Sequence, residues 1–195
     1  MYIQYVLSIC MFALFIAVIF ARTVFMQRRG IRVIVLGQTD KSDFLLAPLI
    51  LAIVYAALAK AFGLPIPGAL VDPFWIGRFT SFIGWAGLFI CAASLVALIL
   101  VFISFGDSFR VGIDEYKPNR LITSGLFAYS RNPIYVCFLS FFFGLFLIHR
   151  SIAITVTAVI FTVVIHRQIL REEKFLESHY GDEYRMYCQR VRRYI

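Results

Sequence analysis

Two short polar motifs in a mostly apolar chain carry the side chains that could do chemistry. The first is Arg131-Asn132-Pro133, which opens an apolar run, and the second is Glu172-Glu173, which follows another. Proline suits the first turn of a helix, where unpaired backbone amides and the helix dipole favour an anion. Arg131 beside such an end could hold a carboxylate or phosphate, or it could serve only as a headgroup contact.

The two glutamates lie on a segment that we expect to be helical. Neighbouring residues on a helix point about 100° apart, so we expect at most one carboxylate to face the other helices easily. A solvated charged pair is the simplest interpretation. The functional alternative is that one glutamate turns toward the polar interval before Arg131, where it could bind an amine or ribose hydroxyls, or offset a cationic cofactor.

The composition places these motifs in an integral membrane protein. Hydrophobic residues make up 61% of the 195-residue chain and the mean hydropathy is +0.84, whereas soluble domains contain roughly 45–50% apolar residues. The net charge of +8 is better explained by membrane orientation and anionic headgroups than by nucleic acid. Four scattered cysteines lack the spacing of a metal site or disulfide framework, so we expect no metal.

The apolar runs define an all-α fold, a polytopic membrane helical bundle of about five transmembrane helices in one domain over residues 1–195. The expected spans are residues 2–21, 44–62, 79–105, 133–148 and 152–165. The first three form a scaffold over 1–105, and the short last two form a helical hairpin within 106–195. Gly84 and Gly87 should let a neighbouring helix approach closely. The charged tail predicts a cytosolic amphipathic helix from His166 to near Gly181 and a second helix after it.

The basic residues predict how the chain crosses the membrane. Sixteen of the 19 Lys and Arg residues lie in the loop after the first span, the interval 106–132 and the tail, and three lie on the other side. The positive-inside rule therefore places the N-terminus outside and both charged segments in the cytoplasm. The polar interval 106–135 is too long for an idle loop, and we interpret it as the floor of a binding site.

The order of these motifs resembles that of the integral membrane methyltransferases, which include isoprenylcysteine carboxyl methyltransferase and the phospholipid N-methyltransferases. The stretch LITSGLFAYSRNPIY over 121–135 is similar to their cofactor signature, and Glu172-Glu173 with YGDEYRMYCQRV over 180–191 is similar to a second one. The resemblance covers roughly residues 104–193. It implies the cofactor S-adenosyl-L-methionine (S-adenosylmethionine) and methyl transfer to a lipophilic or small-molecule acceptor at the cytosolic face, with membrane lipids as partners.

The resemblance also implies roles for individual residues. Those expected to bind the cofactor are Asn119, Arg120, Leu121, Ile122, Gly125, Phe127, Asn132, Pro133, Ile134, Tyr135 and Glu172. Those expected at the reaction itself are Arg131, Tyr135, Glu172 and Glu173. On the substrate side, Gln168, with Arg167 beside it, takes the place of an arginine that handles substrate in the isoprenylcysteine branch.

Three positions depart from the family pattern. Asn132 stands where histidine is frequent, so imidazole chemistry is excluded there, although an amide still donates and accepts hydrogen bonds. Cys137 replaces a common glycine, and Gln168 replaces the arginine, which disfavours a prenylated cysteine as acceptor. Phospholipid amine, prenylated cysteine carboxylate, fatty or isoprenoid acid and small thiol remain open as acceptors.

Two other classes of protein fit the same composition. One is a non-enzymatic lipid-binding or assembly module whose loop and tail dock at headgroups. The other is a membrane reductase of the steroid type, which would need a nicotinamide site whose fingerprint the sequence lacks. No charge lies in the middle of an expected span, which argues against a proton pump or ion-coupled transporter.

Overall fold

The computed structural model describes residues 2–29, 80–105, 121–150 and 152–195, with scattered positions between 48 and 65. In that part of the chain the elements are α1 (Tyr2–Arg28), α3 (Thr80–Phe105), the 3₁₀ turn η4 (Gly125–Ala128), α4 (Pro133–His149), α5 (Ile152–Tyr180) and α6 (Asp182–Arg190). All these elements are helical, which confirms the expected all-α bundle.

Three of the described helices are long and apolar enough to cross a membrane: Ile3–Arg28, Ser81–Phe105 and Ile154–Tyr180. Helix α4 is apolar but has only 17 residues, which gives it a length of about 25 Å, less than a hydrocarbon core of about 30 Å. These helices confirm the first and third expected spans, and the fourth expected span is present as the shorter apolar helix α4. The second expected span, 44–62, lies mostly outside the described residues.

The fifth span differs from the expectation. We expected a short apolar arm over 152–165, but α5 runs for 29 residues from Ile152 to Tyr180. The charged segment after His166 simply continues the apolar run as one helix, because neither proline nor glycine interrupts it. Gly181, with a φ of 54°, ends the helix, and α6 begins at Asp182 as expected.

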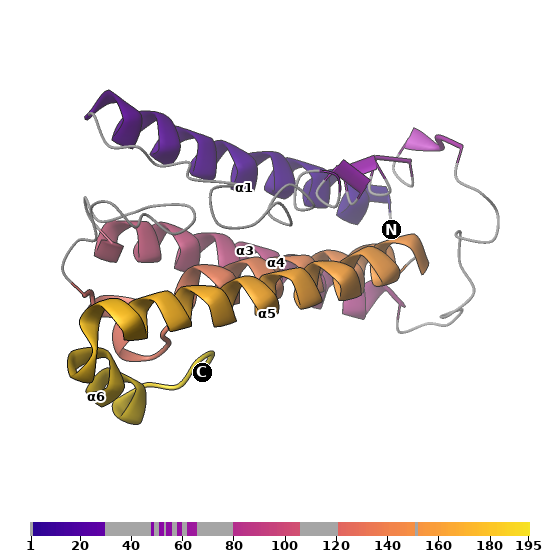
Figure 1. Cartoon of the computed structure of the whole chain (residues 1–195). Coiled ribbons are helices and arrows are strands. Elements are labelled where there is room, and N and C mark those ends of the chain that lie inside the picture. The colour runs from indigo at the N-terminus through magenta and orange to yellow at the C-terminus, as the bar shows by residue number, and fades with distance from the viewer. Residues whose placement is uncertain are drawn as a thin grey trace.

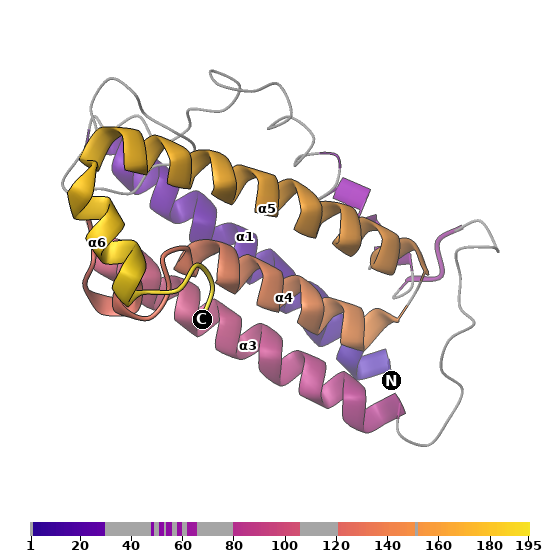
Figure 2. The same ribbon diagram turned by 60° about the horizontal axis from the view of Figure 1, so that its bottom comes forward.

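The helices lie alongside one another in a layered bundle. Figures 1 and 2 show α3, α4 and α5 running side by side, with α1 along one face and α6 across one end, close to the C-terminus. The N-terminus of α1 lies at the opposite end. Successive helices α3, α4 and α5 alternate in direction (Figures 1 and 2).

Close backbone approach joins α3 to its neighbours. A Cβ atom added to Gly87 would lie 2.6 Å from the carbonyl oxygen of Gly144 on α4, and one added to Gly144 would lie 2.7 Å from that of Gly87. A Cβ atom on Gly84 would collide with the Gln4 side chain of α1. The prediction that Gly84 and Gly87 permit close packing is confirmed, with a different neighbour at each position.

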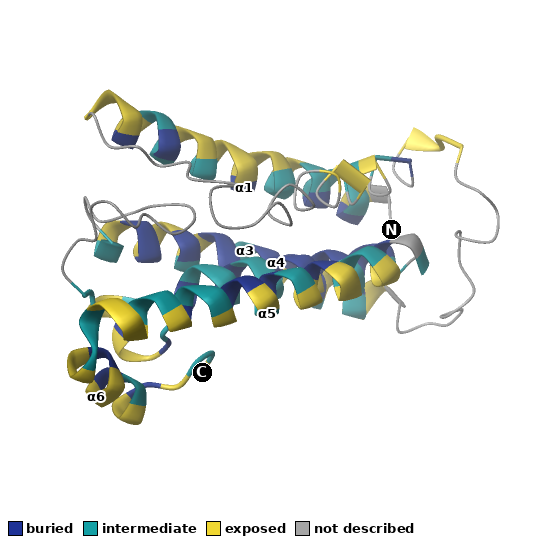
Figure 3. Cartoon of the chain, viewed as in Figure 1, coloured by how far each residue is buried: buried dark blue, intermediate teal, exposed yellow. Residues whose placement is uncertain are grey.

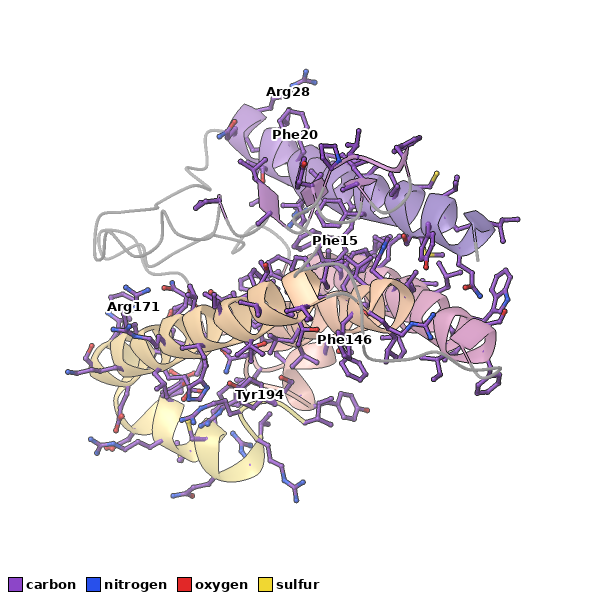
Figure 4. All side chains as sticks on the ribbon, turned by 90° about the vertical axis from the view of Figure 1, so that its right-hand side faces the viewer. Phe15, Phe20, Arg28, Phe146, Arg171 and Tyr194 are labelled. Carbon is purple, nitrogen blue, oxygen red and sulfur yellow. The ribbon has the colours of Figure 1, made fainter. Side chains whose placement is uncertain are left out.

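Aromatic side chains fill the space between the helices. Phe15 of α1 stacks on Phe141 of α4 with ring centroids 4.2 Å apart, and Phe142 meets Phe161 of α5 at 4.4 Å. Figure 3 shows buried residues along the facing sides of the helices and exposed residues outside. In Figure 4, Phe15 lies between α1 and the other helices, whereas Phe20 lies on the outer side of α1 and is 67% exposed. Exposed apolar side chains of this kind suit a lipid-facing surface.

A buried polar cluster fastens the end of the bundle opposite α6. His149 is fully buried, with Nε2 2.8 Å from Ser8 Oγ and its ring stacked on Tyr5. Gln4 donates a hydrogen bond to the carbonyl of Ser81 at 2.9 Å. The packing of α1 against the end of α4 buries the ring of His149.

Candidate active site at the end of the bundle

Four segments meet where α6 crosses the bundle. They are the loop 121–132, the first turn of α4, the second half of α5 and the C-terminal residues 191–195, and Figure 2 shows α6 and the C-terminus close to the start of α4. The expectation that the polar loop and the tail share one end is therefore confirmed for the described residues. Segments more than forty positions apart in sequence supply the side chains of this site.

Local interactions fix where α4 begins. Pro133 occupies the first turn, as expected, and the carbonyl of Asn132 accepts a hydrogen bond from the amide of Val136 at 3.1 Å. The Asn132 side chain does not cap the helix. The backbone N–H of Asn132 donates to Ser130 Oγ at 3.1 Å, and the side-chain amide of Asn132 donates to partners on other elements.

Gly125 holds the loop in its path toward α4. It has a φ of 63°, in the left-handed region that favours glycine. A Cβ atom there would also collide with the side chain of Ser104 on α3. These contacts support a structural role for Gly125; whether it also binds cofactor stays a prediction.

Glu173 is the centre of the first of two hydrogen-bond networks. Its Oε1 accepts from Asn132 Nδ2 at 3.0 Å and lies 3.3 Å from Arg131 Nη2. Its Oε2 accepts from Arg193, with Nε at 2.9 Å and Nη2 at 2.8 Å. Because Glu173 is only 8% exposed, these charge-assisted bonds compensate a carboxylate that would otherwise be costly to bury.

The C-terminal residues form a strap across the start of α4. The carbonyl of Arg192 accepts from the Arg131 amide at 3.0 Å, and the carbonyl of Arg193 accepts from Asn132 Nδ2 at 3.2 Å. Tyr194 Oη lies 2.6 Å from Nδ1 of His166 on α5. The hydrogen bond from Arg193 to Glu173 raises the pKa of the Arg193 guanidinium, so this group stays protonated.

Glu172 is the centre of the second network. Its Oε1 accepts from Tyr135 Oη at 2.5 Å and from Gln168 Nε2 at 2.9 Å. The Arg171 guanidinium donates in turn to Gln168 Oε1. Tyr135 and Glu172 are half-buried, whereas Gln168 is buried, so this carboxylate is more accessible than that of Glu173.

Both glutamates therefore reach the first turn of α4, which corrects our expectation that at most one would face the bundle. The side chains of Glu172 and Glu173 leave α5 in directions that differ by about 100°. Each of them nevertheless finds a partner at the start of α4. Asn132 lies on the side of Glu173, and Tyr135 lies on the side of Glu172. The long glutamate side chains span the remaining difference in direction.

Other predicted residues contribute to packing. Phe127 is buried in the core against Phe105, with ring centroids 4.9 Å apart. Its carbonyl accepts a hydrogen bond from Tyr187 of α6 at 2.6 Å, and burial raises the pKa of Tyr187 to about 12. Leu121 packs against the apolar cluster on α6. The loop is thus fastened to both α3 and α6.

The remaining predicted residues fall into three groups. Ile122 and Ile134 pack against the main core, and Pro133 is buried at the helix start. Arg167 is exposed on α5. Asn119 and Arg120 lie outside the described residues.

Sequence reasoning missed the strap. Arg193, Tyr194 and Ser130 all belong to the networks around α4, yet none was singled out. The only signal was the basic segment Arg192-Arg193 after the second signature, which has no periodicity and is easily interpreted as a headgroup contact.

The donor set of this site suits a cationic organic ligand better than a metal. Among the described residues there is no group of three His, Cys, Asp or Glu side chains that could hold a metal ion. Glu172 offers a half-buried carboxylate that accepts a hydrogen bond from the Tyr135 hydroxyl. A carboxylate can hold an ammonium or sulfonium cation or ribose hydroxyls. S-adenosylmethionine carries all three, so the residues present fit it.

The fold and the site define a polytopic helical membrane protein with a network of charged residues at one end of the bundle. The chain matches the phospholipid methyltransferase family over residues 82–183, just over half of its length, and it belongs to this family. The family match begins at residue 82, whereas the resemblance of the motifs begins near residue 104. The difference arises because the family match includes nearly all of α3. No solved structure matches the chain.

One curated relative adds a local similarity. A stretch of 38 residues is 58% identical to an uncharacterized protein of Haemophilus influenzae (strain Rd), and it covers 19% of this chain and 60% of that protein. The chain thus spans less than two thirds of that relative. The family itself favours a methyltransferase over the two other classes that the composition allowed.

Proposed function

We propose that the protein transfers a methyl group from S-adenosylmethionine to a membrane-resident acceptor at the cytosolic face. The observation that carries the proposal is the hydrogen bond of 2.5 Å between Tyr135 and Glu172, two residues that the motifs assigned to cofactor binding and to the reaction. Membership of the phospholipid methyltransferase family supports it.

Each network has its own task in this proposal. The Glu173 network holds the loop, α4 and the strap together, because its carboxylate is already compensated by Arg131 and Arg193. Glu172 is half-buried beside Tyr135 and Gln168 and would hold the positively charged part of the cofactor. Asn132, Ile134 and Tyr135 would form the wall at the start of α4.

S-adenosylmethionine, when bound, supplies a methyl group activated by a positively charged sulfur. The residues of the chain would orient the two reactants, and alignment alone can contribute roughly 7–11 kcal/mol in favourable cases. A carboxylate or thiolate acceptor would need no proton transfer. For an amine acceptor, the oxygens of Tyr135 and Glu172 are the groups placed to take the proton.

Binding of the cofactor is tested by calorimetry on the full chain in detergent. We expect wild-type protein to bind S-adenosylmethionine and Glu172→Gln to bind it at least tenfold more weakly, since a hydrogen bond to a charged group contributes about 1.5–3 kcal/mol. Glu177→Gln is the matched control, because Glu177 lies on the same helix but is exposed and pairs only at the surface with Arg185. Absence of binding at millimolar cofactor, with Glu172→Gln silent, would instead support a non-enzymatic lipid module.

The acceptor is tested by transfer of a radiolabelled methyl group to a total membrane lipid extract, resolved by chromatography. Label in a lipid fraction that is lost with Glu172→Gln supports the proposal. Label in no lipid fraction contradicts a lipid acceptor. The orientation that we propose, with the N-terminus outside, is checked by the activity of a reporter enzyme fused after Ile195, which should work only in the cytoplasm.

A further inference from the structure

The second half of α5 carries a row of basic side chains on one face. Arg167, Arg171 and Lys174 follow one another at intervals of four and three residues. At about 100° per residue, their directions fall within about 60° of one another. Arg167 and Lys174 are exposed, and Arg171 is partly exposed. We call these three residues the basic stripe. In Figure 4, Arg171 lies on the part of α5 that leads to α6.

The basic stripe continues an apolar face of the same helix. Val156, Ile160 and Val163 precede Arg167 at intervals of three and four residues, so they point to the same side of α5. Their side chains are 50%, 45% and 54% exposed, which suits contact with lipid. An exposed apolar face that becomes basic at one end is typical of a helix that passes from hydrocarbon into the headgroup layer.

The length of α5 places the basic stripe at this boundary. A hydrocarbon core of about 30 Å takes about 20 residues of helix. Counted from Ile152, where α5 begins, the core ends at about residue 172. The basic stripe therefore lies at the level of the phosphate groups, and it does so because α5 continues unbroken past His166.

The charge of the basic stripe is not balanced by acidic side chains of the described residues. The ion pairs of Glu173, Glu177 and Asp182 on α5 and α6 are made with arginines outside the stripe. No ion pair joins Arg167 or Lys174 to an acid in the part of the chain that the structure describes. Guanidinium and ammonium groups both bind phosphate. A phosphate diester at this level therefore supplies the complementary charge.

Arg171 also belongs to the candidate active site. Its guanidinium donates to Gln168 Oε1, and Gln168 Nε2 donates to Glu172 Oε1 at 2.9 Å. The same carboxylate oxygen accepts from the Tyr135 hydroxyl. An anion that holds the Arg171 guanidinium would therefore fix the orientation of the Gln168 amide, and with it the position of the Glu172 carboxylate.

We propose that the basic stripe binds the headgroup of an anionic phospholipid, and that this lipid stabilises the Gln168–Glu172 arrangement for cofactor binding. The lipid acts as a regulator and is distinct from the methyl acceptor, because the stripe recognises its negative charge. The first half of the proposal stands on the stripe alone, whereas the second half rests on the proposed function.

Lipid binding is measured by native mass spectrometry of the full-length protein in detergent, titrated with phosphatidylglycerol or with phosphatidylcholine of the same acyl chains. We expect phosphatidylglycerol to bind about tenfold more tightly or better. Arg167→Gln and Lys174→Gln should each weaken its binding by about fivefold, the contribution of one basic side chain at an anionic surface. Arg185→Gln is the matched control, because Arg185 is exposed on α6 and already paired with Glu177 and Asp182.

Three results overturn the lipid site. One is equal binding of the two lipids, and another is an unchanged affinity for phosphatidylglycerol in both stripe variants. The third is displacement of the lipid by an equal concentration of glycerol phosphate, which would assign the stripe to a soluble anion.

The link to the candidate active site is tested by calorimetry with S-adenosylmethionine in phosphatidylcholine nanodiscs, with and without phosphatidylglycerol. We expect phosphatidylglycerol to tighten cofactor binding to wild type by about fivefold. At saturating phosphatidylglycerol, Lys174→Gln should keep this effect and Arg171→Gln should lose it, because Arg171 is the stripe residue that bonds to Gln168. Cofactor binding by Arg171→Gln in phosphatidylcholine alone serves as the check of folding. The same tightening in Arg171→Gln as in wild type contradicts the link.

The two measurements separate this inference from the proposed function. Selective binding of phosphatidylglycerol without any binding of S-adenosylmethionine keeps the lipid site and removes the proposed function. Cofactor binding and methyl transfer without any preference for phosphatidylglycerol keep the proposed function and overturn the lipid site. Selective lipid binding that leaves the cofactor affinity of wild type unchanged overturns the regulatory half of the proposal.

Discussion

Asn132 and Glu173, 41 residues apart in sequence, are joined by a hydrogen bond of 3.0 Å between Nδ2 and Oε1. Both side chains are buried, and the same asparagine nitrogen also donates to the carbonyl of Arg193 in the strap at 3.2 Å. One amide thus connects α4, α5 and the C-terminal residues. Where the family often has histidine, this chain has a residue whose amide group satisfies two acceptors at once.

Replacing Glu173 by glutamine should destabilise the protein. The substitution leaves the charges of Arg131 and Arg193 without their counter-ion in a largely buried site, and we expect a loss of about 2–4 kcal/mol. Thermal unfolding in detergent can be followed with a fluorescent thiol probe once the exposed Cys10 and the half-buried Cys188 are replaced by serine, because Cys91 and Cys137 are buried until the bundle opens. Glu177→Gln, at an exposed ion pair, should unfold like wild type; an unaltered Glu173→Gln would contradict the proposed role of this network.

Tyr135 and Glu172 should behave as one unit in catalysis. We expect Tyr135→Phe and Glu172→Gln each to lower the rate of methyl transfer by about tenfold to a hundredfold, since each removes a charge-assisted hydrogen bond. The double variant should lose little more than Glu172→Gln alone, because the Tyr135 hydroxyl then has no carboxylate left to bond. Rates measured over the four proteins form a double-mutant cycle, and losses that multiply would show that the two residues act separately.

Placing a methyl group between α3 and α4 should be costly. In Gly144→Ala the new Cβ atom would lie 2.6 Å from Cys91 Sγ and 2.7 Å from the backbone carbonyl of Gly87, so the helices must separate. We expect a loss of about 1–3 kcal/mol, the usual cost of overpacking. Ala93→Val on the exposed side of α3 is the control, and equal melting temperatures for the two variants would argue against close contact of these helices.

The Tyr187 hydroxyl should stabilise the loop 121–132 through its hydrogen bond to the Phe127 carbonyl. Tyr187→Phe leaves the Phe127 carbonyl without its donor, at an expected cost of about 1 kcal/mol near neutral pH. Tyr129→Phe, in the same loop but 75% exposed, should have no effect. The comparison is made by thermal unfolding of the three proteins.

The pH dependence of this contribution has a definite sign. Burial raises the pKa of Tyr187 to about 12, whereas an unfolded tyrosine has a pKa of about 10. The folded protein therefore keeps the proton after the unfolded chain has lost it. The stabilisation is complete below about pH 10 and is lost as the pH rises toward about 12. The advantage of wild type over Tyr187→Phe should shrink over that range, and an advantage that grows would contradict a buried donor.

Several features of the fold could be predicted from the sequence, because a bilayer restricts the possible structures. Uncharged runs of about 20 residues must form helices that satisfy their own backbone hydrogen bonds. That reasoning predicted α1, α3 and α4, and Pro133 marked the start of α4 to the residue. It failed at α5, because a change from apolar to charged composition was taken as the end of a helix when only proline, glycine or a cap would have ended it.

The candidate site was only half predictable for a different reason. Residue types and their order determined the family and named Tyr135, Glu172 and Glu173, because those features are local to each motif. Which glutamate meets Tyr135 and which meets Asn132 depends on how α5 is rotated against α4, and that rotation is set by long-range packing such as Phe142 on Phe161. The strap, too, reaches α4 only once α6 has folded back. The sequence by itself therefore determined which reactive side chains the site contains. The tertiary structure decided which of them form hydrogen bonds with one another.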